Sequence, residues 1–224
     1  MNQKNFNHVE KVWVEEINDL STTDKNGSRW YECPIGSLPS VTTVTGFEKA
    51  AFFAKWQREN PKESKRVLAR GNQLHSTIED YLNNEEIDLS SIPPVESQLF
   101  LQMKKELDKI DNIHELETPL WSEATMLAGR VDCVAEYDGK LSIIDFKGST
   151  RKKRQKDITN YFLQATAYAI AWQERTNIPI HNFVILISSE DGSVQAFQGN
   201  PVDYAKELLD VIKRFHDQFT PSML

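Results

Sequence analysis

The chain has 224 residues and a formal net charge of −7, with 39% hydrophobic and 10% aromatic residues. This length suits one domain, and the apolar content can build a core, which excludes wholesale disorder. A protein that coats nucleic acid through its overall charge would be basic. Any contact with nucleic acid must therefore come from a local group of cations.

Cysteine usage and hydropathy bear on the compartment. Cys33 and Cys133 lie too far apart for a metal-ligand motif and form no disulfide framework. No run reaches the roughly 18 apolar residues of a membrane span, and the first 20 residues resemble neither a secretory signal nor an Arg-rich transit peptide. We expect reduced, buried thiols, no membrane association and a cytoplasmic location, in a bacterial or phage-infected cell.

Short strands, loops and then helices are expected in the first half of the chain. Residues 9–17 partly alternate, DKNGS is a turn, and RWYEC resumes a strand. Apolar spacing predicts helices over 47–60, 65–83 and 95–110. Pro61 ends the first helix, and Ser40, Thr42 or Thr43 can cap its start.

The hydrophobic period changes after the third helix. Strands are predicted near 114–121, 125–137 and 140–147, a helix over 157–176, strands over 181–188 and 193–198, and a closing helix over 202–219. This order of elements predicts an α/β (α+β) layer fold around a mixed sheet.

The sequence YDGK predicts a hairpin between the second and third of these strands. Asp138 and Gly139 are a favoured pair for a two-residue type I′ turn, and strand-forming residues flank them. If they form the loop, Asp132 lies directly opposite Asp145 on one face of the sheet. Lys147 lies two residues beyond Asp145 and shares that face.

Two carboxylates in facing positions repel each other. Their Cβ atoms would be about 5 Å apart, and at an effective dielectric of about 20 the repulsion is roughly 3 kcal/mol. A shared proton or a bound divalent cation would remove the conflict, and hard divalent cations prefer carboxylate ligands. The alternative is that both acids are surface residues at strand ends and that Lys147 makes a salt bridge.

Several sequence elements around this hairpin occur in a recognisable order. They are RGNQLHSTIE, GRVDCVAEYDGKLSIIDFK and YFLQATAY, which carry His75, then Asp132, Asp145 and Lys147, then Gln164 and Tyr168. Together they resemble the core of the PD-(D/E)xK nuclease superfamily in its RecB-like form. LPSVTTVTGF further resembles a segment near the start of a mitochondrial and phage exonuclease branch of that superfamily. The resemblance spans roughly residues 29–190.

The resemblance implies a restriction-endonuclease-like mixed sheet flanked by helices, with an N-terminal helical elaboration. It divides a single nuclease domain into a strand and loop segment (1–46), a helical arch-like region (47–112), a catalytic sheet with the Q-x-x-x-Y helix (113–200) and a C-terminal helix (201–224). By analogy, the arch-like region could let a single strand thread through it.

The resemblance also implies a metal-dependent reaction. Asp132, Asp145 and the backbone carbonyl of Phe146 would hold Mg²⁺ or Mn²⁺, with His75 as a further ligand. Lys147 would position or deprotonate the attacking water, and the products would carry 5′ phosphates. The four cysteines that hold an iron–sulfur cluster in some related nucleases are absent, so no such cluster is expected.

Other residues have both a functional and a structural interpretation. Gln164 and Tyr168 would support the DNA strand or the catalytic lysine, although Tyr168 also fits the core stripe of its helix. Glu79 would orient His75 from behind the metal ligands, or be a plain surface acid. Glu117 resembles an acid common at this position of the superfamily, and a strand salt bridge is an equal alternative.

Five cations occupy six positions directly after the catalytic strand. Such runs are usually solvated, but this position beside the metal centre predicts phosphate contacts. The residues expected to bind DNA are Ser40, Thr42, Thr43, Ser149, Arg151, Lys152, Lys153, Arg154 and Lys156. The aromatic residues Phe47, Phe52, Phe53 and Trp56 could stack on unpaired bases, or belong to the core.

These expectations describe a metal-dependent DNA exonuclease acting on single-stranded ends or flaps in replication, repair or recombination. The alternatives are a double-strand end-resecting recombination exonuclease, a structure-specific endonuclease, or a DNA-binding module that has lost turnover. One departure from the superfamily pattern is Gly148, which stands where a threonine usually follows the lysine. Its loss of a hydroxyl leaves the backbone N–H free for a phosphate.

Overall fold

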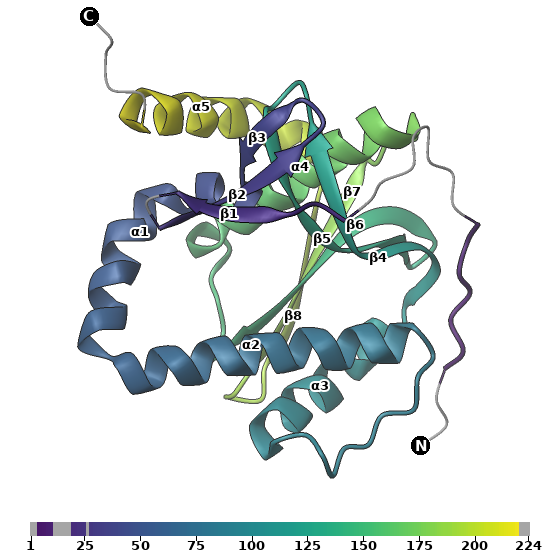
Figure 1. Ribbon diagram of the computed structural model, residues 1–224. Coiled ribbons are helices and arrows are strands. Elements are labelled where there is room, and N and C mark those ends of the chain that lie inside the picture. The colour runs from purple at the N-terminus through teal and green to yellow at the C-terminus, as the bar shows by residue number, and fades with distance from the viewer. Residues whose placement is uncertain (1–3, 11–18, 26, 220–224) are drawn as a thin grey trace, which may run out of the picture.

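The computed structural model describes residues 4–10, 19–25 and 27–219. Its elements in chain order are β1 (Thr22–Lys25), β2 (Ser28–Cys33), β3 (Gly36–Pro39), α1 (Val41–Glu59), α2 (Pro61–Leu82), α3 (Pro94–Leu107), β4 (Ile110–Ser122), β5 (Leu127–Tyr137), β6 (Lys140–Ser149), a 3₁₀ turn (Gln155–Asp157), α4 (Thr159–Thr176), β7 (Asn182–Ser189), β8 (Val194–Gly199) and α5 (Pro201–Phe219). Strands β1 to β3 form a small sheet, and β4 to β8 form the central sheet in sequence order (Figure 1).

The central sheet is mixed, which confirms the predicted fold class. Strands β4 to β6 form an antiparallel meander, and β7 pairs antiparallel with β8. Strands β6 and β7 run parallel, so α4 serves as the crossover between them. This places the start of α4 directly after the end of β6.

The two faces of the sheet bury two separate cores. On β7, Phe183, Ile185 and Ile187 join the core with α4 and α5, whereas Val184 and Leu186 join the core with α2 and α3. This alternation follows the period of two of a strand buried on both faces. Each of these side chains stabilises the fold by roughly 1.5–3 kcal/mol through burial.

Helix α1 begins at Val41, six residues before the start predicted at residue 47. The sequence offered Ser40, Thr42 and Thr43 as possible caps and did not decide between them. The backbone N–H of Thr43 donates to Ser40 Oγ at 3.0 Å, so Ser40 is the N-cap and Val41 opens α1. Pro61 occupies the first position of α2, where its missing N–H costs nothing. The alternating segment 9–17 falls largely outside the described residues.

Helices α1 and α2 form an L-shaped bracket beside the sheet (Figure 1). Only the first turns of α1 reach the core, and residues 48–55 are all exposed. Phe52 and Phe53 are 68% and 51% exposed, which excludes the core interpretation for these two aromatics. A helix with this exposure leaves its apolar side chains free for another molecule.

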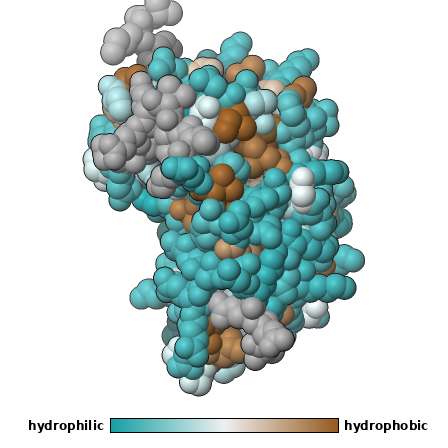
Figure 2. Space-filling view, turned by 90° about the vertical axis from the view of Figure 1, so that its right-hand side faces the viewer, coloured by the Kyte–Doolittle hydropathy of each residue, from teal (hydrophilic) through white to brown (hydrophobic). Residues whose placement is uncertain are grey.

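The surface is otherwise ordinary for a folded domain. The face shown in Figure 2 is mainly hydrophilic, with apolar residues in small separate areas. None of the described helices combines the length and apolar character that a membrane crossing requires.

Candidate active site

The predicted hairpin register is confirmed. Tyr137 faces Lys140, and the pairing continues in that register to Cys133 and Ile144. The turn residues Asp138 and Gly139 have φ values of 48° and 75°, the left-handed values that a type I′ turn requires.

The expected ladder pair of Asp132 with Asp145 does not form. Pairing ends one position earlier, and the backbone N–H of Phe146 donates to Asp132 Oδ2 at 2.9 Å. A side-chain carboxylate has thus taken a backbone donor at the point where the two strands separate. The two acids are therefore not a ladder pair, although the charges of both act on His75.

Asp145 is buried and ion-paired with Lys147. Lys147 Nζ lies 2.7 Å from Asp145 Oδ1, and Asp145 is only 4% exposed. Burial raises the pKa of Asp145 to about 6 in spite of the lysine. Burial opposes the charge of Lys147 as well, but the carboxylates of Asp145 and Asp132 outweigh that effect and raise its pKa. The second oxygen of Asp145 is buried and has no hydrogen-bond partner among the described residues.

Helix α2 brings His75 to these acids. Leu74 and Ile78 are buried in the core on either side of it in sequence, which leaves His75 at the rim. His75 Nδ1 lies 3.6 Å from Asp132 Oδ2 and 3.6 Å from Glu117 Oε1. Burial opposes protonation of His75, but these two carboxylates outweigh it and raise its pKa to about 9.

Glu117 lies beside His75 and so belongs to the predicted metal centre, whereas the sequence left its role open. Its φ of 46° is left-handed, a conformation that costs a residue with a side chain of order 1 kcal/mol. The guanidinium of Arg130 donates to the carbonyl of Glu117 and supports this conformation. Strand β4 therefore supplies a third acid beside the two predicted on β5 and β6.

The donor atoms of His75, Glu117 and Asp132 fit a divalent cation. One donor atom from each lies within 4.8 Å of the others. A nitrogen with carboxylate oxygens suits Mg²⁺ or Mn²⁺, and the orphan oxygen of Asp145 adds a buried acceptor nearby. A cation here would also offset the negative charge of the carboxylates, which His75 and Lys147 balance in its absence.

A pocket of about 520 Å³ opens over this group. Tyr168, Thr42 and Glu79 are among the residues that line it. Burial and the charge of Glu117 raise the pKa of Glu79. Within the described part of the chain Glu79 makes no hydrogen bond or ion pair with His75, so the structure does not place it as the residue that orients the histidine.

The two residues of the Q-x-x-x-Y element lie in different places. Tyr168 is buried at the wall of the active-site pocket, against Gly129. Gln164 lies one turn earlier on α4 and lines a separate hollow of about 320 Å³ beside α1, with Thr43 and Phe47. Its buried Oε1 has no hydrogen-bond partner among the described residues. The structure brings Tyr168, but not Gln164, to the pocket that holds Asp132.

Sequence reasoning missed Tyr161 and Arg130. Lys147 Nζ lies 5.3 Å from the centre of the Tyr161 ring, within the range of a cation–π contact. Tyr161 lies two turns before Tyr168 on the apolar stripe of the same helix, and this spacing was the available signal. Arg130 gave no signal apart from its place two residues before Asp132.

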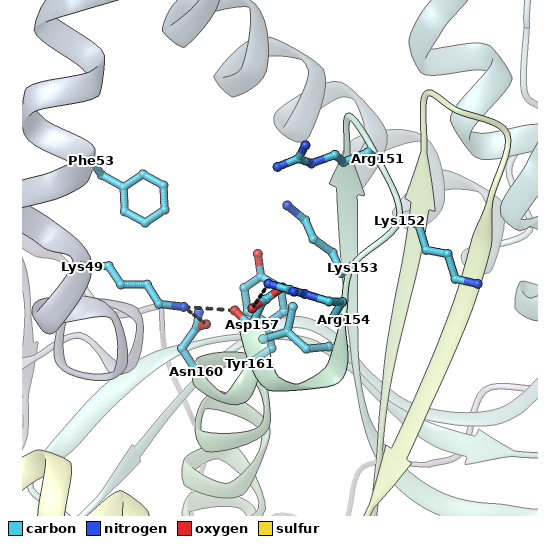
Figure 3. A pocket seen from close by; sticks show the side chains of 10 residues that line it. Lys49, Phe53, Arg151, Lys152, Lys153, Arg154, Asp157, Asn160 and Tyr161 are labelled. Atoms are coloured by element: carbon cyan, nitrogen blue, oxygen red, sulfur yellow. Dashed lines mark hydrogen bonds and ion pairs between the residues drawn. The ribbon is translucent and has the colours of Figure 1, made fainter.

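The residues expected to bind DNA are not equivalent. Ser40 Oγ is occupied as a cap, and Ser149 Oγ donates to the carbonyl of Arg151 at 2.8 Å. Thr42 is exposed and lines the active-site pocket. Arg151, Lys152, Lys153 and Arg154 line a second pocket, shown in Figure 3, whereas Lys156 is exposed and lines none of the pockets described here.

The mixed sheet and the acidic group at the point where β5 and β6 separate are the features expected of a PD-(D/E)xK nuclease. A family model that describes the PD-(D/E)XK nuclease superfamily matches residues 40–220. The chain belongs to this superfamily, which confirms the predicted class. The match covers α1 to α5 and so includes every residue of the centre.

Three relatives share sequence with the chain. The mouse protein named mitochondrial genome maintenance exonuclease 1 is 27% identical over 83% of this chain and 60% of its own length. The protein of the same name from Xenopus tropicalis is 27% identical over 70% of this chain and 50% of its own. The human protein of that name is 30% identical over 57% of this chain and 38% of its own. The chain thus spans about half the length of these relatives.

Proposed function

We propose that this protein is a metal-dependent DNA exonuclease that hydrolyses phosphodiester bonds at single-stranded ends or flaps. The observation that carries the proposal is the convergence of His75, Glu117 and Asp132 beside the Asp145–Lys147 pair. The exonuclease names of its relatives support the mode of attack.

The proposed centre holds Mg²⁺ or Mn²⁺ through Asp132, His75 and Glu117, with Asp145 and the carbonyl of Phe146 on the neighbouring strand. When bound, the cation supplies Lewis-acid stabilisation of the scissile phosphate and its leaving oxygen. Lys147 orients the attacking water through its ammonium hydrogens. Asp145 fixes the position of that ammonium at 2.7 Å.

The reaction needs a phosphate held still beside the water. Tyr168 forms one wall of the active-site pocket, which α2 also lines, and limits how far a strand can enter. Attack on the phosphorus with departure of the 3′ oxygen leaves the phosphate on the 5′ end of the product, as the superfamily resemblance implies.

The preference for single strands rests on the bracket of α1 and α2. Its exposed stretch 48–55 lies outside the core, and Lys49 and Phe53 of this stretch line the second pocket, shown in Figure 3. The superfamily resemblance implies an arch-like helical region that a single strand threads, and the exposed bracket is the corresponding part of this chain. We infer that a free end threads under the bracket before cleavage.

A comparison of substrates tests this proposal. Linear single strands, covalently closed single-stranded circles, linear duplexes and nicked circles would be digested side by side with Mn²⁺. Rapid loss of the linear single strand, with the closed circle intact, is expected. Rapid cleavage of the closed circle would contradict threading, and preferred digestion of the linear duplex would favour an end-resecting recombination exonuclease.

We further propose that the protein works in the cytoplasm of a bacterial or phage-infected cell.

A further inference from the structure

A second pocket of about 740 Å³ lies between the bracket and the start of α4. Helix α1 provides Lys49 and Phe53 on one side, and the segment after β6 provides Arg151 and Lys153 on the other (Figure 3). Tyr161 lies at its base. We call these five residues the cationic pocket.

The side chains of the cations after β6 point in different directions. Gln195 holds the backbone of Lys153 through two hydrogen bonds, at 2.8 Å to its N–H and 2.9 Å to its carbonyl. Figure 3 shows the side chains of Arg151 and Lys153 directed toward Phe53, whereas Lys152 points away. Arg154 is paired with the exposed carboxylate of Asp157 at 2.7 Å. Two of the five cations therefore face the pocket without a partner.

The pocket holds more positive than negative charge: five cations line it, and Asp157, the one acid among its described lining residues, is paired with Arg154. Arg151 and Lys153 make no ion pair with any carboxylate in the described part of the chain. Lys49 Nζ donates to the carbonyl of Asp157 at 3.0 Å and to Asn160 Oδ1 at 3.1 Å, and neither acceptor is a carboxylate. Burial and then the charge of Arg151 lower the pKa of Lys153. Cations gathered in this way favour binding of an anion.

The cationic pocket adjoins the catalytic centre. Tyr161 lines it and also lies under the ammonium of Lys147. A strand whose scissile phosphate lies at Asp132 can therefore extend past Lys147 into this pocket.

We propose that the cationic pocket is a metal-independent subsite for an internal phosphate of the strand held at the active site, with Phe53 stacking on a neighbouring base. The inference rests on the proposed function, adds Lys49 to the residues that bind the strand and selects Phe53 from the aromatic residues that could stack on a base. Phosphate contacts by Arg and Lys position a strand without reading its sequence, and stacking on an aromatic ring tolerates every base.

Salt dependence of binding tests the phosphate contacts. Fluorescence anisotropy in EDTA would follow a 3′-labelled oligothymidylate of about 20 nucleotides, long enough for several subsites. Each lost phosphate contact to a single strand lowers the slope of log K against log salt by about 0.7. The double variant Arg151→Gln and Lys153→Gln loses the contact to the one internal phosphate and should therefore lower that slope by about 0.7.

A control of equal charge separates the pocket from bulk electrostatics. Lys156→Gln and Lys206→Gln remove the same amount of charge from exposed side chains that do not line this pocket and make no ion pair in the described part of the chain. This pair should change the slope by less than about 0.3. Equal slopes in the two double variants would overturn the subsite. Thermal unfolding would verify that both variants are folded.

The aromatic wall has its own matched pair. Phe53→Leu should weaken binding by at least about fivefold, because a stacked base is lost. Phe52→Leu should leave binding within about twofold, since Phe52 does not line the cationic pocket. Equal effects would contradict stacking on Phe53. Strands with and without a 5′ phosphate should give the same losses, and a loss confined to the phosphorylated strand would overturn the assignment to an internal phosphate.

The outcome is separable from that of the proposed function. Metal-dependent cleavage by the wild type with no difference between the double variants would reject the subsite and leave the nuclease intact. A slope difference without any cleavage by the wild type would support the subsite and reject the nuclease. Absence of binding by the wild type would reject both.

Discussion

Asp132 Oδ2 accepts a hydrogen bond from the backbone N–H of Phe146 at 2.9 Å, at the point where the β5–β6 ladder ends. This contact ties the first acid of the centre to the strand that carries Asp145 and Lys147. One oxygen of Asp132 is thereby fixed, and it lies 3.6 Å from His75 Nδ1. The positions of these side chains therefore depend both on the register of the β5–β6 hairpin and on the packing of α2, which carries His75.

Gly129 leaves the space that the Tyr168 hydroxyl occupies. A Cβ at Gly129 would lie 2.6 Å from that hydroxyl oxygen, and the buried ring has little room to move. We expect Gly129→Ala to lower the free energy of unfolding by about 1–3 kcal/mol and to reduce nuclease activity by displacing Tyr168. Denaturant unfolding and digestion rates would measure both effects.

Gly71→Ala is the matched control for that substitution. Gly71 lines the same pocket from α2, and an added Cβ meets no atom within 4 Å. Alanine also favours the helix by roughly 0.5–1 kcal/mol. Wild-type activity with equal or higher stability is expected, and a similar loss in both variants would contradict the role assigned to Tyr168.

The glycine that departs from the superfamily pattern is explained by packing. A Cβ at Gly148 would lie 3.3 Å from Leu74 Cδ2 and 3.5 Å from Arg70 Nε. Arg70 is only 3% exposed and is held by an ion pair with Glu190, so it cannot make way. Gly148→Thr should therefore cost about 1–3 kcal/mol of stability, and Gly148→Ala less. A threonine variant as stable as the wild type would contradict this explanation.

Glu117 and Glu79 should differ in metal binding. Glu117→Gln removes a carboxylate whose oxygen lies 3.6 Å from His75 Nδ1 and should weaken Mn²⁺ binding at least about tenfold. Glu79→Gln removes the same charge from the same pocket, but Glu79 is not part of the three-residue group, so less than about threefold is expected. Calorimetric titration with Mn²⁺ would measure both, and equal losses would contradict the assignment of Glu117 as a ligand.

Binding of single strands in EDTA should weaken at alkaline pH. Burial and neighbouring cations lower the pKa of Lys153 below its ordinary value of 10.5 in the free protein. The charged groups that face it are Arg151, Asp157, Arg70 and Lys49. A bound phosphate favours the ammonium form, so affinity is full below the lowered pKa of Lys153 and falls as pH rises through it. Lys153→Arg should remove this decline up to about pH 10, because arginine stays charged.

Much of the fold followed from local signals. The Asp138–Gly139 turn sets the hairpin register, and a register error of one residue would turn every side chain to the other face. Periodicity located the helices, but the start of α1 depended on which of several hydroxyls forms the cap, and that choice is decided by the surrounding packing.

The site was harder to predict where it depends on tertiary structure. Glu117 reaches the centre through a left-handed backbone conformation on β4, and no local pattern indicates this. Lys152 and Lys153 look alike in sequence, yet Figure 3 shows the Lys153 side chain directed toward Phe53 and that of Lys152 directed away, with Gln195 holding the backbone of Lys153. Tyr161 was hidden because an apolar stripe cannot show which of its members contacts a functional lysine.

The most direct test of the account is digestion of end-labelled oligonucleotides by the wild type and by Lys147→Ala, with Mg²⁺, Mn²⁺ or EDTA. Lys140→Ala is the control, because Lys140 is an exposed lysine at the other end of the same strand. We predict metal-dependent degradation by the wild type and the control, and a rate at least about 100-fold lower for Lys147→Ala. Equal rates for the two lysine variants, or degradation that persists in EDTA, would contradict the catalytic centre described here.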